Sequence, residues 1–64
     1  MKRAKFIKHL NQNNCGFIKH GSRHDKYKNH INGKKTVIPR HTEIDDYLCE
    51  LICKQLEIPK PTRK

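Results

Sequence analysis

Two stripes of apolar residues, one near each end of the chain, repeat at helical spacing. The first stripe predicts a one-faced helix over residues 2–13. Its apolar positions are Ala4, Phe6, Ile7 and Leu10. Asn11, Asn13 and Asn14 follow, and asparagine tolerates the left-handed backbone conformation that closes helices. We therefore expect the chain to turn before Cys15.

The second stripe is longer and predicts a helix in the last third of the chain. Its members are Ile44, Tyr47, Leu48, Leu51, Ile52 and Leu56. Thr42 can cap the start of this helix, because Asp45 stands three residues later in the capping-box position. The helix should end near Glu57, because Pro59 disfavours helical backbone in the residue before it.

Between the helices, short apolar patches are separated by turn residues and predict three strands. The first strand covers residues 15–20 and leads into a tight turn at Gly21-Ser22. The second covers residues 24–28. A loop with hairpin composition at residues 29–33 precedes the third strand, residues 36–38, which Pro39 stops.

Alternation along the second strand divides its side chains between two faces. His24, Lys26 and Lys28 share one face, while Asp25 and Tyr27 share the other. If Tyr27 faces the core, His24 lies in solvent among lysines. Tyr27 could instead stack on a nucleic-acid base, but the alternation favours core packing.

The order helix, three short strands, helix predicts an α+β fold. The simplest construction is a three-stranded antiparallel sheet with both helices on one face, the layout of a double-stranded-RNA-binding-type sandwich. The 64 residues leave room for one domain, which we place at residues 1–58, followed by a basic tail at 59–64. Disorder is disfavoured because the apolar residues are periodic.

The net charge of +9 is distributed unevenly along the chain. Through His41 there are eleven lysines or arginines against Asp25 alone, whereas residues 42–58 hold five acidic residues against Lys54. A surface like the first part attracts polyanions, with nucleic acid as the leading partner. Membrane binding is disfavoured, because the basic residues do not lie on one amphipathic helix with bulky apolar anchors.

The three cysteines, Cys15, Cys49 and Cys53, form an odd set that implies no disulfide framework. Cys49 and Cys53 stand four residues apart on the predicted second helix, so we expect them to share its apolar side as buried core residues. No signal peptide or transmembrane run is evident, so a cytoplasmic location is expected. Five histidines are also present, but their spacing is poor for a metal site, because His20 and His24 straddle a Gly-Ser turn. We expect neither a metal nor a cofactor.

Four segments, in this order, are similar to the HicA family of bacterial toxins, and the resemblance runs from Met1 to about Pro59. The family's strand motif G-x-x-H-x-x-[YF] resembles Gly21-Ser22-Arg23-His24 with Tyr27. The other three segments are Met1-Lys2-Arg3 with Ile7-Lys8-His9-Leu10, Ile38-Pro39-Arg40-His41-Thr42-Glu43-Ile44 and Ile52-Cys53-Lys54-Gln55-Leu56-Glu57-Ile58-Pro59. One departure is Asn14, where the family usually has glycine.

The resemblance implies an α-β-β-β-α fold and mRNA cleavage that arrests growth. It also implies a HicB-type antitoxin that binds the toxin and covers the catalytic histidine, which in the G-x-x-H motif of this chain is His24. We expect a monomer alone and a hetero-oligomer with the antitoxin.

The residues around His24 suit the cleavage of RNA by its own 2′-hydroxyl. That reaction needs proton transfer and positive charge near the phosphate, and histidine exchanges protons near neutral pH. Neighbouring cations favour the proton-accepting form of the ring. Lys26 and Lys28, with Arg23 beside the turn, are candidates for RNA binding; these three are inferred from alternation and not from the family.

Two other functions fit the same residues. One is an RNA-binding module that does not cut, and the other is a small DNA-binding or ribosome-associated protein. His41 is expected to pack or to bond within a turn, although a second catalytic part is an alternative. His9, His20 and His30 are expected to be solvated.

Overall fold

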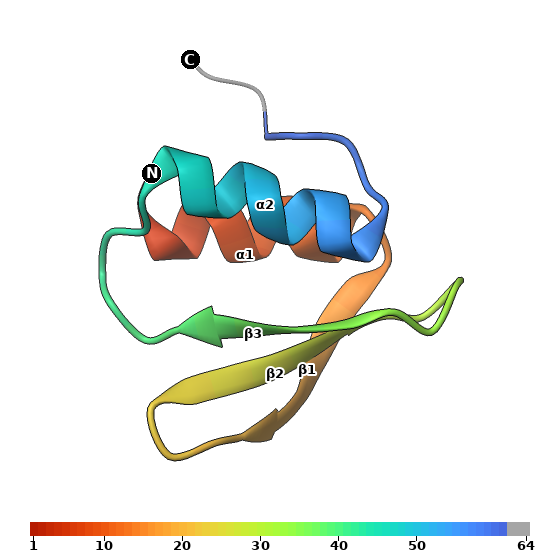
Figure 1. Ribbon diagram of the computed structural model, residues 1–64, viewed down its shortest axis with the longest axis horizontal. Coiled ribbons are helices and arrows are strands. Elements are labelled where there is room, and N and C mark those ends of the chain that lie inside the picture. The colour runs from red at the N-terminus through yellow and green to blue at the C-terminus, as the bar shows by residue number, and fades with distance from the viewer. Residues whose placement is uncertain (62–64) are drawn as a thin grey trace.

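The structure is a computed structural model that describes residues 1–61. Two helices flank three strands along the chain (Figure 1), in the order helix, three strands, helix that the sequence predicts. The elements are α1 (Arg3–Gln12), β1 (Cys15–His20), β2 (His24–Asn29), β3 (Lys35–Pro39) and α2 (Asp46–Leu56). The strand bounds differ from the prediction by one residue at most.

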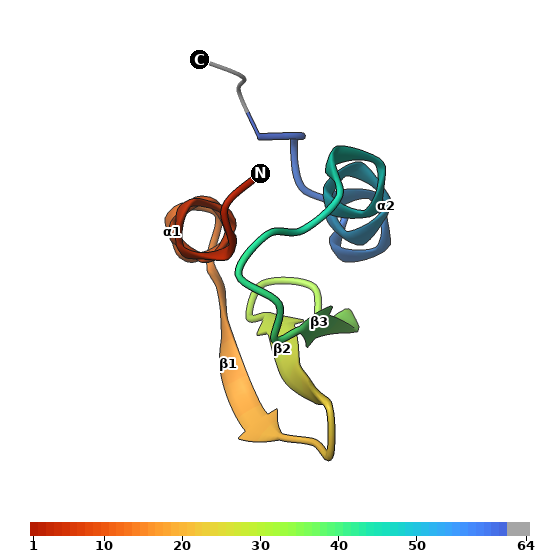
Figure 2. The same cartoon turned by 90° about the vertical axis from the view of Figure 1, so that its left-hand side faces the viewer.

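The three strands form one antiparallel sheet in the order β1-β2-β3. Both helices lie side by side on the same face of this sheet (Figure 2), with α1 against β1 and α2 against β3. We call the other face, away from the helices, the open face. The predicted α+β layout of a double-stranded-RNA-binding-type sandwich is therefore confirmed.

Helix α1 packs on the sheet through Phe6 and Leu10, which are fully buried one helical turn apart. Ala4 is exposed, so its predicted place on the buried stripe is wrong. The helix ends through Asn14, whose φ of 65° lies in the left-handed region. Glycine adopts that region without steric cost, and asparagine tolerates it better than most other residues. Asparagine can therefore occupy this position.

Helix α2 begins at Asp46, four residues after Thr42, so the predicted cap at Thr42 is wrong. The reason is a pairing with the start of the chain that keeps the residues before α2 extended. The amide of Arg3 donates to the carbonyl of Thr42 at 2.8 Å, and the amide of Ile44 donates to the carbonyl of Met1 at 2.8 Å. Asp45 is the N-cap residue, and its side chain makes no capping hydrogen bond.

The buried face of α2 is rotated from the predicted stripe. Tyr47 and Leu51 are exposed, at 72% and 40%, and therefore do not belong to the core as predicted. Cys49 and Cys53 are buried, as their spacing predicts. The other predicted members are Ile44, Ile52 and Leu56, which are buried, and Leu48, which packs partly against the core.

The end of α2 is fixed by its own backbone and by two asparagines, one at the end of β2 and one in the loop that follows it. Glu57 has a φ of 59°, and the amide of Ile58 donates to the carbonyl of Cys53 at 3.0 Å, so the helix ends where predicted. The carbonyl of Leu56 also accepts hydrogen bonds from the side-chain amides of Asn29, at 2.9 Å, and Asn32, at 3.1 Å.

The core between sheet and helices contains all three cysteines as free thiols. Burial raises the pKa of Cys53 to about 11, so its thiol is neutral at physiological pH. The remaining core residues are Phe6, Leu10, Tyr27, Ile38, Ile44, Ile52 and Leu56. Tyr27 therefore packs in the core, as the alternation predicts.

Neither helix in residues 1–61 has the length and apolar character needed to cross a membrane. Of the predicted basic tail, residues 62–64 lie outside the described part of the chain. Within it, the carbonyl of Pro59 lies 2.8 Å from Nε2 of His9. The division into a domain at 1–58 and a tail at 59–64 stays a prediction.

Candidate active site and nucleic-acid interface

His24 is the first residue of β2 and lies exposed on the open face, at the end of the β1–β2 hairpin. Asp25 and Tyr27 are buried on the opposite side of the strand, so the alternation along β2 is the predicted one. The hairpin extends away from both helices (Figures 1 and 2), which leaves its tip open. His24 therefore stands in solvent.

Four lysines share the open face with His24. Residues directly opposite one another in an antiparallel pair point to the same face. Lys19 of β1 lies opposite Lys26, and Lys35 of β3 lies opposite Lys28. Like charges placed opposite one another repel, so this lysine face (Lys19, Lys26, Lys28 and Lys35) is suited to an anion that binds between them.

Sequence reasoning found only half of the lysine face. Lys26 and Lys28 followed from alternation along one strand, whereas Lys19 and Lys35 become neighbours only through the strand register. A register shift between Phe17 and Lys19 also changes the face of the residues that follow in β1. Pairing the first two predicted strands about their turn could have placed Lys19 near Lys26. It could not have located this register shift.

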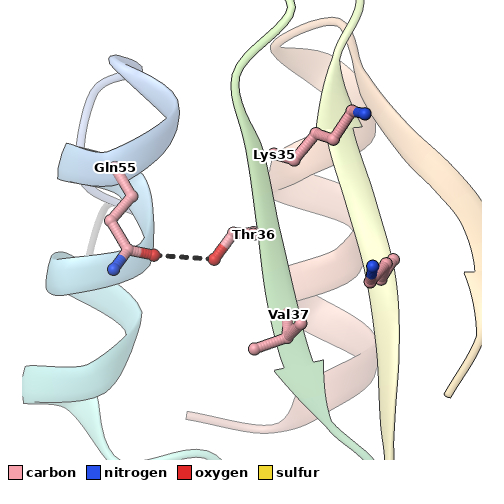
Figure 3. A pocket seen from close by; sticks show the side chains of 5 residues that line it. Lys35, Thr36, Val37 and Gln55 are labelled. Carbon is pink, nitrogen blue, oxygen red and sulfur yellow. Dashed lines mark hydrogen bonds between the residues drawn. The ribbon is translucent and has the colours of Figure 1, made fainter.

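The lysine face continues to the outer edge of the sheet. There a pocket lies between β3 and α2 (Figure 3), and two of the lysines line it. In this pocket the hydroxyl of Thr36 donates to Oε1 of Gln55 at 2.7 Å, which ties the strand to the helix. The lining residues are Lys26, Lys35, Thr36, Val37 and Gln55.

The turn before His24 requires glycine at position 21. The amide of Gly21 donates to the carbonyl oxygen of His24 at 2.6 Å. A Cβ atom on Gly21 would lie 2.7 Å from that same oxygen, closer than real contacts allow. Arg23, the third predicted RNA-binding residue, is exposed in this turn, beside His24.

Asp25 follows His24 in β2 and lies on the opposite face of the sheet, where it binds three basic side chains. Its Oδ1 accepts from Nδ1 of His20 at 2.7 Å and from Nε of Arg40 at 2.9 Å. Its Oδ2 accepts from the guanidinium of Arg3 at 2.8 Å. The guanidinium of Arg40 also donates to the carbonyl of Gly21, so this cluster reaches the turn.

The cluster keeps Asp25 ionised although the residue is buried. The hydrogen bond from His20 lowers the pKa of Asp25 most, burial opposes it, and the hydrogen bond and charge of Arg40 lower it further. An ionised carboxylate only accepts hydrogen bonds, so Nδ1 of His20 carries the proton between them. His20 is therefore exposed, as predicted, but it also binds Asp25, a contact that the sequence did not predict.

Sequence reasoning missed this cluster because alternation assigns a face and not a partner. The available signal was that Asp25 is the sole acidic residue among the first 41. A single carboxylate in a basic, inward-facing position needs cationic partners to be buried.

The remaining histidines are spread over the molecule. His30 belongs to the loop after β2, at the end of the sheet opposite to His24. His41 is exposed two residues after Pro39, which lies opposite His24 in the strand register, so the predicted packing role is wrong and the predicted turn hydrogen bond stays a prediction. His9 contacts the carbonyl of Pro59. In residues 1–61, no three histidine, cysteine, aspartate or glutamate side chains gather in a way that could hold a metal ion.

Comparison with known proteins gives one match. The sequence model of a family described as the HicA toxin of bacterial toxin-antitoxin matches residues 3–58. The search of curated proteins finds no match, and neither does the search of solved structures.

Proposed function

The chain belongs to the HicA family of bacterial toxin-antitoxin toxins, and from this premise we propose that it is a metal-independent endoribonuclease that cleaves mRNA. His24 is its general acid or base, and Arg23, Lys26 and Lys28 bind the RNA. The observation that carries the proposal is an exposed imidazole on the same sheet face as four lysines.

The chemistry needs no nucleophile from the protein. The 2′-hydroxyl of the RNA attacks the adjacent phosphate, and His24 accepts its proton, a contribution of about 10²–10⁴-fold in rate. Lysines near the phosphate stabilise the negative charge that develops in the transition state. Lys19 and Lys35 belong to this binding surface as well, since each lies opposite one of the predicted lysines.

The proposed partner is a HicB-type antitoxin with an acidic surface that covers His24. A lysine face attracts an acidic protein for the same electrostatic reason that it attracts RNA. The toxin would act in the cytoplasm as a monomer, and a hetero-oligomer with the antitoxin would be its inactive form.

The test is cleavage of RNA in excess EDTA by the wild type and by His24→Ala. We expect the wild type to cut and His24→Ala to lose about 10²–10⁴-fold in rate, with an unchanged circular dichroism spectrum because the ring is exposed. His30→Ala, also exposed but at the opposite end of the sheet, is the control and should cut at the wild-type rate. Equal cutting by wild type and His24→Ala would contradict the assignment of His24.

A non-catalytic RNA-binding module is the second candidate, because the lysine face alone would support it. In that case the wild type binds RNA without cutting it, and His24→Ala binds equally well. In both cases binding should weaken as salt rises, because lysines that neutralise phosphates release counterions. Only the enzyme leaves cleaved products.

A further inference from the structure

The hairpin end carries a second exposed imidazole, that of His20, which Asp25 holds in one orientation. We propose that His20 is a second catalytic residue, the general acid that protonates the 5′-oxygen leaving the scissile phosphate. The inference rests on the proposed endoribonuclease function and adds one residue to its mechanism.

Two contacts orient the ring of His20. Its Nδ1 donates to Oδ1 of Asp25 at 2.7 Å, and the ring packs against Phe17 with centroids 4.7 Å apart. The side chain is nevertheless 73% exposed. Because Nδ1 is engaged, Nε2 is the nitrogen open to a substrate. A carboxylate that fixes one ring nitrogen and leaves the other free is a general way to orient a histidine for proton transfer.

Asp25 does not need His20 to be neutralised. Arg3 from α1 binds Oδ2 at 2.8 Å, and Arg40, which follows β3, binds Oδ1 at 2.9 Å. The two arginines already pair this buried carboxylate, and His20 adds a third contact, to Oδ1. That contact also holds the exposed ring of His20 in one orientation. Asp25, Arg3 and Arg40 are the charged groups of this cluster.

The reaction includes two proton transfers, and each can be assisted by a separate group of the protein. The 2′-oxygen forms a bond to phosphorus, and the bond from phosphorus to the 5′-oxygen breaks, which leaves a 2′,3′-cyclic phosphate and a 5′-hydroxyl. One proton leaves the 2′-hydroxyl for the base, while another passes from the acid to the 5′-oxygen. In the proposed mechanism His24 accepts the proton of the 2′-hydroxyl, so the role left for His20 is that of the acid.

The rings of His20 and His24 lie on opposite faces of the sheet at the end of the hairpin. His20 lies opposite Asp25 in the register and shares its face, whereas His24 lies on the open face. In-line displacement likewise has its entering and leaving oxygens on opposite sides of phosphorus. RNA that crosses the projecting tip (Figure 2) would bring a phosphate to Arg23, with one histidine on either side.

The experiment compares His20→Asn with the wild type in EDTA. Asparagine can keep a donor near the place of Nδ1, and so the bond to Asp25, but it has no group at the place of Nε2. We expect His20→Asn and His20→Ala each to lose about 10²-fold or more in rate, with RNA affinity within about twofold. His30→Asn, at the other end of the sheet, is the matched control. Wild-type cutting by His20→Asn would overturn the proposal, because a positioning role alone would then suffice.

An RNA with sulfur in place of the scissile 5′-oxygen separates acid from base. A thiolate leaves without being protonated, so His20→Asn should cut this substrate within about tenfold of the wild type, while His24→Ala stays impaired by the full factor of a lost base. A deficit of His20→Asn that stays the same on both substrates would overturn the acid role. If the wild type cuts neither substrate, the endoribonuclease function itself fails; if only the His20 variants behave as wild type, that function stands and the His20 inference fails.

Discussion

Gly21 allows the close approach of two backbone segments that fixes the position of His24. Its amide donates to the carbonyl of His24 at 2.6 Å, and a Cβ atom would meet that oxygen at 2.7 Å. The glycine of the G-x-x-H motif thus has a physical reason in this chain. Any larger residue must displace the backbone that carries the proposed catalytic ring.

We expect Gly21→Ala to reduce RNA cleavage more than it reduces stability. The shift of the turn should cost about 1–3 kcal/mol in the free energy of unfolding, while a misplacement near 1 Å can lower the rate about 10²-fold. Gly16→Ala is the stability control, since its Cβ would meet only the end of the His30 side chain. Urea unfolding and a cleavage assay check both values, and a wild-type rate for Gly21→Ala would show that the turn does not position His24.

For single residues, the sequence predicted which face of the sheet a side chain lies on, but it did not predict which side chains would bind one another. Alternation placed His24, Lys26 and Lys28 together because a strand has a fixed period of two. Which cations surround Asp25 depends on three other elements packing together, and no local pattern encodes that arrangement.

At the scale of elements, α2 shows why a stripe read from one helix can be rotated in the fold. The predicted stripe counted Tyr47 and Leu51 as core residues because both are large and apolar. Cys49 and Cys53 are buried in the core, whereas Tyr47 and Leu51 are exposed. Small thiols fit a close contact between helix and sheet, and size alone does not decide which face is buried.

Truncation on the two sides of α2 should therefore have very different effects. We expect Leu56→Ala, at a fully buried position, to lower the free energy of unfolding by about 2–5 kcal/mol. Tyr47→Ala, at a position 72% exposed, should change it by about 0.5 kcal/mol or less. Urea titration followed by circular dichroism measures both. Comparable losses in the two variants would contradict the orientation of α2.

At the scale of the whole molecule, Asp25 joins parts of the chain that are distant in sequence. Arg3 comes from α1, His20 from β1 and Arg40 from the segment after β3, and all three bind this one carboxylate of β2. The order and sheet topology of these elements could be predicted from periodicity and turn residues. The cluster that connects them could not, because it forms only once they have packed.

The Asp25 cluster predicts a loss of stability in acid. The hydrogen bond from His20, together with Arg40, lowers the pKa of folded Asp25 below its ordinary value of 3.8. As the pH falls, the unfolded chain therefore binds the proton first, so the free energy of unfolding decreases from about pH 4 down to the folded-state pKa. Asp25→Asn should be less stable than the wild type at pH 7, and the difference should narrow towards pH 3.

Urea unfolding at pH 7, 4 and 3 measures that difference. Asp45→Asn, which changes an exposed aspartate without a side-chain capping bond, is the control for acid effects in general. A gap between wild type and Asp25→Asn that stays constant from pH 7 to pH 3 would rule out this contribution of Asp25.

In the proposed reaction the RNA's own 2′-hydroxyl, helped by the exposed His24 on the lysine face, attacks the adjacent phosphate and cuts the RNA. Its most direct test is the chemical identity of the 3′ ends that the purified protein produces from RNA in excess EDTA, determined by mass spectrometry. We expect 2′,3′-cyclic phosphates, and no cut at a site where a single 2′-hydroxyl is replaced by hydrogen. Fragments that end in a 3′-hydroxyl, or cutting at the 2′-deoxy site, would contradict it.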